Sequence, residues 1–96
     1  MLPNFELLFS IPEDHDLVLT RSRARGGVIR GEYWSHEELD RSGTVIARYE
    51  SRDEVDAHGH SQRGWRKYDS TGTLAEERTV SESWPMQPKR QLSRAA

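Results

Sequence analysis

The chain has 96 residues, with 14 basic and 16 acidic side chains, 33% hydrophobic residues and no cysteine. This length suits one domain with a small core, and the balanced charge argues against a dedicated polyanion binder. The lack of cysteine excludes disulfides, thiolate zinc sites and cysteine nucleophiles. No run approaches the ~20 apolar residues of a transmembrane helix and the N-terminus lacks a signal-peptide pattern, so we expect a cytoplasmic protein that does not enter a membrane.

The N-terminal part of the chain is predicted to form two short strands and a loop. Residues 5–9 and 16–20 are apolar runs separated by Pro12 and an acidic cluster. Runs this short, broken by proline, favour strands over helices. Residues 21–27 carry arginines at alternate positions followed by two glycines, which predicts a polar loop where the chain reverses.

The remainder of the chain is predicted to be a series of strands. Residues 28–39 alternate with a side-chain period of two, so Tyr33 and Trp34 are expected on opposite faces of a sheet. Further strands are predicted at residues 44–50, 63–68 and 73–80. The hydrophilic stretch 51–62 is expected to be a linker.

Two turn sequences, Asp40-Arg41-Ser42-Gly43 and Asp69-Ser70-Thr71-Gly72, recur in the matching contexts LDRSGTV and YDSTGTL. Aspartate at the first position accepts hydrogen bonds from amides further along the turn, and glycine supplies the positive φ that follows a type I turn. The sequence therefore predicts two hairpins with glycine bulges. The expected cross-strand pairs are Leu39 with Val45, Tyr68 with Leu74 and Arg66 with Glu76.

Residues 64–77, with the sequence GWRKYDSTGTLAEE, resemble the MORN-variant repeat of the YwqK-like family. Residues 31–49 resemble a degenerate copy that keeps Asp40, Gly43 and Val45. The resemblance covers about half of the chain and implies successive hairpins in an extended sheet that serves as an interaction scaffold. The first 27 residues do not match the repeat, and the linker separates copies that elsewhere follow closely.

These patterns predict an all-β fold, a single-domain antiparallel β-meander of about five to seven strands with two Asp-x-x-Gly hairpins. The sheet domain is expected over residues 1–84, with Trp84 packed against it. Residues 85–96, which contain two prolines and several basic side chains, are expected to be a mobile basic tail.

His58 and His60 are the candidate metal ligands in the sequence. Two imidazoles at this spacing point to the same face of a strand, and together with Asp56 or Asp53, and with His36 to complete the set, they would offer a zinc or nickel site. The alternative is a solvated loop, and the spacing matches no established metal signature, so no cofactor is expected. No recognisable frame of nucleophile, base and orienting acid is present, so we expect a protein that is not an enzyme.

The aromatic residues suggest a first functional hypothesis. Trp34 and Trp65 are expected on the sheet face opposite the apolar hairpin pairs, as either a second small core or an exposed patch. Because tryptophan and tyrosine dominate binding hot spots, the hypothesis is a non-catalytic module that binds another protein, or a second copy of itself as a homodimer, through an aromatic sheet face.

The alternative hypothesis is RNA or DNA binding by residues 21–30. Arginine side chains here would contact phosphates while neighbouring aromatic rings stack on bases. The residues concerned are Arg21, Arg23, Arg25 and Arg30, with Tyr33 and Trp34 beside them. Neighbouring glutamates and the net charge of −2 weigh against this alternative.

Overall fold

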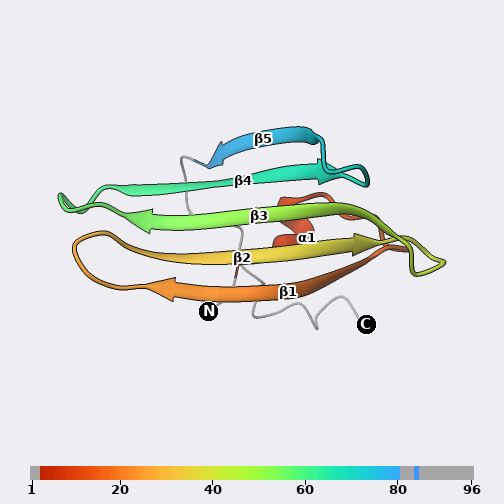
Figure 1. The fold of residues 1–96 in the computed structure, drawn as a ribbon, viewed down its shortest axis with the longest axis horizontal. Coiled ribbons are helices and arrows are strands. Elements are labelled where there is room, and N and C mark those ends of the chain that lie inside the picture. The colour runs from red at the N-terminus through yellow and green to blue at the C-terminus, as the bar shows by residue number, and fades with distance from the viewer. Residues whose placement is uncertain (1–2, 81–83, 85–96) are drawn as a thin grey trace, which may run out of the picture.

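The strands of this protein follow one another in a simple meander (Figure 1). The computed structural model describes residues 3–80 and 84. Its elements are α1 (Phe5–Leu8), β1 (Asp16–Arg25), β2 (Arg30–Leu39), β3 (Val45–Val55), β4 (Ser61–Asp69) and β5 (Leu74–Val80). Each strand pairs antiparallel with the next in the order β1-β2-β3-β4-β5, which confirms the predicted all-β antiparallel meander with five strands. The predicted tail at 85–96 lies outside the described residues.

Three hairpin turns share one construction, an aspartate followed three residues later by glycine. They are Asp40 with Gly43, Asp56 with Gly59 and Asp69 with Gly72. In each, the aspartate Oδ1 accepts hydrogen bonds of 2.9 to 3.1 Å from the amides two and four residues on. Each glycine has a φ between 83° and 87°, a conformation that glycine adopts without strain.

The middle turn corrects the prediction of a linker at residues 51–62. β3 continues to Val55 and β4 begins at Ser61, so that only Asp56 to His60 connect them. Polar and charged side chains dominate this stretch because both strands expose them alternately. The prediction of a linker was wrong because a half-exposed strand tolerates a hydrophilic composition.

The register of the predicted hairpins is confirmed at the apolar pairs and corrected at the charged pair. Leu39 pairs with Val45, and Tyr68 pairs with Leu74. Beyond Tyr68 the register shifts and leaves Ala75 unpaired, so that Arg66 lies opposite Glu77 and not Glu76. The Arg66 Nε donates to the Glu77 Oε2 at 2.6 Å.

The N-terminal predictions are corrected in two places. Residues 5–9 were expected to be a strand, but residues 5–8 form α1, where the Asn4 side chain accepts a 3.0 Å hydrogen bond from the Leu7 amide. Residues 21–27 were expected to be a loop, but β1 continues to Arg25. Arginine at alternate positions is the period of an exposed strand face, and this explains the longer β1.

The sheet has two unlike faces, which we name by what lies on them. The covered face carries Trp34, Tyr49 and Trp65 and packs against α1 and Phe9 (Figure 1). The open face carries the alternate residues of the same strands, and no described helix or strand covers it. Within the described residues, no helix has the length and apolar character to cross a membrane.

Candidate functional site

The tryptophans of the first hypothesis belong to a core. Trp34 and Trp65 are only 3% and 5% exposed, and both contact the N-terminal segment. The Phe5 ring lies 5.2 Å from Trp34, and the Phe9 ring stacks on Tyr49 at 4.0 Å between centroids. Of the two alternatives left open, a second core or an exposed patch, the structure has the core. The covered face is therefore closed by the chain itself and presents no free aromatic surface.

Trp84 joins the same core, as predicted from the sequence. Its ring packs edge-on against Trp34, and its Nε1 donates a 2.8 Å hydrogen bond to the Asp53 Oδ2. The side chain is 8% exposed. A buried tryptophan thus finds a partner for its only polar atom, as its burial requires.

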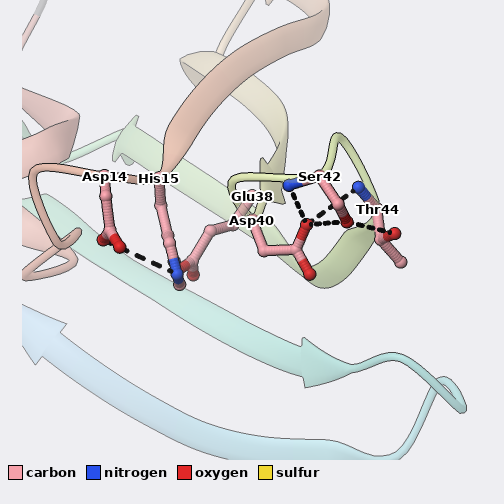
Figure 2. Close-up of polar contacts among 6 residues, drawn as sticks. All are labelled: Asp14, His15, Glu38, Asp40, Ser42 and Thr44. Atoms are coloured by element: carbon pink, nitrogen blue, oxygen red, sulfur yellow. Dashed lines mark hydrogen bonds and ion pairs between the residues drawn. The ribbon is translucent and has the colours of Figure 1, made fainter.

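A buried carboxylate anchors the N-terminal segment to the sheet (Figure 2). Glu38 on β2 receives His15 Nδ1 on its Oε2 at 2.6 Å and the Tyr49 hydroxyl on its Oε1 at 2.8 Å. The hydrogen bond to Glu38 raises the pKa of His15, and Asp14 adds to this effect. Burial and the Glu38 bond raise the pKa of the Tyr49 hydroxyl. Both carboxylate oxygens are thereby satisfied, which offsets the cost of burying the charge.

His36 is the second titratable group in the core. Its ring centroid lies 4.4 Å from that of Phe5 and 5.9 Å from that of Phe9, and 5% of the residue is exposed. Burial lowers its pKa from 6.5 to about 4, so the ring is neutral at pH 7. Its Nδ1 has no hydrogen-bond partner among the described residues.

The candidate metal residues serve the β3–β4 turn. The Oδ1 of Asp56 accepts from the amides of His58 and His60, and its Oδ2 lies 3.5 Å from the His60 Nδ1. The amide of His60 contributes most to lowering the Asp56 pKa. His36, the fourth candidate, is packed between phenylalanine rings. In the described part of the chain, no group of three or more metal-binding side chains is placed to hold an ion.

The open face contains a hollow of about 290 Å³ over the first four strands. Ser35 on β2 and Glu50 on β3 lie opposite each other in its floor, joined by a 3.0 Å hydrogen bond. Its lining residues are Arg21, Arg23, Tyr33, Trp34, Ser35, Glu50, Ser51, Arg52 and Arg66. Four guanidinium groups and one carboxylate therefore border the same space.

The first side of the hollow is built by β1 and β2. Arg23 pairs with Tyr33 across the strands, and its guanidinium carbon lies 4.7 Å from the centroid of the ring, a cation–π contact. The Tyr33 hydroxyl donates to Glu54, which raises the pKa of the phenol, while Arg25 acts in the opposite direction. The ring is therefore held by Arg23 over its face and by Glu54 at its hydroxyl.

The second side is built by β3 and β4, where a glycine makes room for an arginine. A side chain at Gly64 would begin 3.1 Å from the Arg52 Nη1 and 2.8 Å from the Arg78 carbonyl oxygen. Glycine thus lets the Arg52 guanidinium lie across β4. Arg66 is oriented by its ion pair with Glu77. Both guanidinium groups border the hollow in defined positions.

The structure sorts the predicted binding residues into three groups. It brings Arg21, Arg23 and Tyr33 together in the hollow. It places Arg25 at the end of β1, near the Tyr33 hydroxyl, and it buries the side chains of Trp34 and Trp65. Arg52 and Arg66 complete the hollow and were missed, because their place on the open face depends on strand pairings across residues predicted to be a linker.

Comparisons with protein-family models, with curated proteins and with solved structures found no match to this chain. The resemblance of residues 64–77 to the MORN-variant repeat stays a prediction.

Proposed function

We propose that this protein is a non-catalytic interaction module that binds another protein through the open face of its sheet. One observation carries the proposal: the N-terminal segment closes one face, whereas no described helix or strand covers the other face, which contains an arginine-bordered hollow. Tyrosine and arginine are residue types enriched in binding hot spots.

The composition of the hollow supports binding over catalysis. Its lining offers guanidinium donors, the Ser35 hydroxyl and one carboxylate, a set suited to holding a charged or polar group. No histidine lines it, so the commonest general base is not at hand. The cysteine-free composition is compatible with a reducing compartment, and we place the module in the cytoplasm.

Nucleic-acid binding is the second candidate. The observation that favours it is the convergence of Arg21, Arg23 and Tyr33 with two further arginines on one sheet face. The carboxylates that surround the hollow favour a protein partner, because a long polyanion would pass over them at unfavourable electrostatic cost.

The test is affinity purification of the tagged protein from its native cell extract, with and without nuclease, comparing two tryptophan variants. Ser35→Trp fills the hollow without changing charge, whereas Ala57→Trp places the same side chain in the exposed β3–β4 turn. We expect a nuclease-resistant protein partner that Ser35→Trp loses and Ala57→Trp retains.

Two outcomes would contradict the proposal. Equal recovery of the partner by both variants would show that the open face is not the binding surface. Loss of all partners after nuclease treatment would transfer the function to nucleic acid. Light scattering of the purified protein measures its molar mass and shows whether the partner is a second copy of this chain.

A further inference from the structure

We propose that the hollow binds a phosphorylated side chain of the partner protein. This inference rests on the proposed function and names the chemical group that the open face recognises. The observations behind it are the number of guanidinium groups at the hollow, the way they are held and the position of the surrounding carboxylates.

The hollow has more positive charge than a single carboxylate can neutralise. Arg21 and Arg23 border it from β1, and Arg52 and Arg66 border it from β3 and β4. Glu50 in the floor and Glu77, which pairs with Arg66, offset two of the four positive charges. A phosphate monoester carries a charge of about −1.5 to −2 at pH 7 and three acceptor oxygens, whereas a carboxylate carries one charge and two oxygens. The phosphate therefore matches this set of donors better.

The arginines of the hollow differ in the partners that they contact within the protein, and this difference favours the binding of an anion. Arg23 stacks on Tyr33 and Arg66 pairs with Glu77, which fixes their orientation. Among the residues that the structure describes, Arg21 and Arg52 form no ion pair. Their donors are available to a ligand, and guanidinium groups bind phosphate oxygens with two parallel hydrogen bonds.

Carboxylates interrupt the positive charge around the hollow, although Arg25 and Arg48 lie on the same face outside it. On the open face, Glu37 follows Ser35 along β2, Glu54 follows Arg52 along β3, and Glu77 lies opposite Arg66 on β5. A nucleic-acid strand carries a phosphate at every nucleotide and would meet these carboxylates. A peptide with one phosphorylated residue would place its negative charge at the centre of the hollow. Its neutral or basic residues would then lie near the surrounding carboxylates.

The experiment uses the whole chain and defined probes. Fluorescent glycine-flanked peptides with one phosphoserine, one phosphotyrosine or one glutamate, and a single-stranded oligouridine, are titrated with wild type, Arg21→Glu and Arg41→Glu. Arg41 lies exposed in the β2–β3 turn, so its variant has the same change in net charge away from the hollow. Inorganic phosphate is titrated in parallel while the Nε–H signals of Arg21, Arg52 and Arg66 are followed by NMR.

We expect at least one phosphopeptide to bind about tenfold or more tightly than the glutamate peptide. Arg21→Glu should weaken it by at least about tenfold, and Arg41→Glu by less than about twofold. Inorganic phosphate should shift the three arginine signals at the hollow. Arg52→Gln, which keeps a polar side chain over Gly64, should show the same loss if Arg21→Glu fails to fold.

Several outcomes would overturn the inference. Equal binding of glutamate and phosphopeptides would remove the phosphate specificity, and equal losses in Arg21→Glu and Arg41→Glu would reduce the effect to net charge. Tighter binding of oligouridine with the same dependence on Arg21 would assign the hollow to nucleic acid. If these tests fail while Ser35→Trp still loses its protein partner, the interaction module stands and only the phosphate recognition is wrong.

Discussion

The two faces of this sheet are built from the same strands but have different roles. Trp34 and Tyr33 are neighbours in β2, yet the first is buried under α1 and the second borders the hollow. The covered face gathers aromatic rings and the buried carboxylate of Glu38, whereas the open face gathers guanidinium groups. In a small single-layer sheet, the alternation of side chains thus separates the residues that stabilise the fold from those available for binding.

The polar groups of the two faces also differ in what they contribute to stability. On the covered face, Glu38 is buried and both its oxygens are occupied, so removing a partner leaves a costly unpaired group. On the open face, Arg66 and Glu77 are each about half exposed, and such surface pairs contribute about 0–1 kcal/mol. Substitutions on the covered face should therefore change stability, and those on the open face should change binding.

The largest effect is expected for the adjacent pair Trp34→Ala and Tyr33→Ala. Trp34→Ala removes a buried ring between Phe5 and Trp84 and should lower the free energy of unfolding by about 3–5 kcal/mol. Tyr33→Ala removes a half-buried ring and its bond to Glu54, and should cost about 1–2 kcal/mol. Urea denaturation followed by circular dichroism measures both values. Equal losses of unfolding free energy in the two variants would contradict the assignment of stability to the covered face and of binding to the open face.

Most of the fold could be predicted from local patterns. Alternation in residues 28–39 and the two turns at Asp40 and Asp69 identified β2, the hairpins and their apolar pairs. The third turn, at Asp56, has the same Asp-x-x-Gly spacing, but polar residues flank it in place of the apolar residues that mark the other two turns. Short helix α1 was missed because four residues are too few to show a helical period.

The site could be predicted only in part, because it is assembled across strands. The alternating arginines of β1 were identified as a binding feature, but their placement in a loop hid the fact that they share a face with Tyr33. Arg52 and Arg66 come from β3 and β4, whose register is set by the unrecognised turn at Asp56. The burial of the tryptophans depends on α1, so the covered face could not be distinguished from an exposed one by parity alone.

The next effect concerns His36, whose replacement by leucine should flatten the acid side of the stability profile. Its folded pKa of about 4 lies below the value of 6.5 in the unfolded chain, so as pH falls from 6.5 to 4 the unfolded chain binds the proton first. Wild type should therefore lose on the order of 3 kcal/mol over this window from His36. His36→Leu lacks this loss and leaves no unsatisfied ring nitrogen at neutral pH.

Urea denaturation of wild type and His36→Leu at several pH values between 7 and 4 tests this prediction. The turn carboxylates Asp40 and Asp69, whose pKa values are lowered by the Ser42 and Thr71 side chains, affect both proteins equally. The exposed His58→Leu serves as the control for replacing a histidine by leucine outside the core. Parallel profiles for wild type and His36→Leu would show that the buried imidazole is not the source of the acid sensitivity.

The smallest effect is expected at His15, whose hydrogen bond to Glu38 links the N-terminal segment to the covered face. Its pKa is raised above 6.5 by the hydrogen bond to Glu38, so its contribution to stability is complete below pH 6.5 and declines as pH rises through the folded pKa. An NMR titration of the His15 ring protons should give a pKa above 6.5 in wild type. Glu38→Gln should lower it more than Asp14→Asn does, because Glu38 lies at 2.6 Å and Asp14 at 3.9 Å. If Glu38→Gln left the pKa of His15 unchanged, the contact between His15 and Glu38 would not hold the N-terminal segment on the sheet in solution.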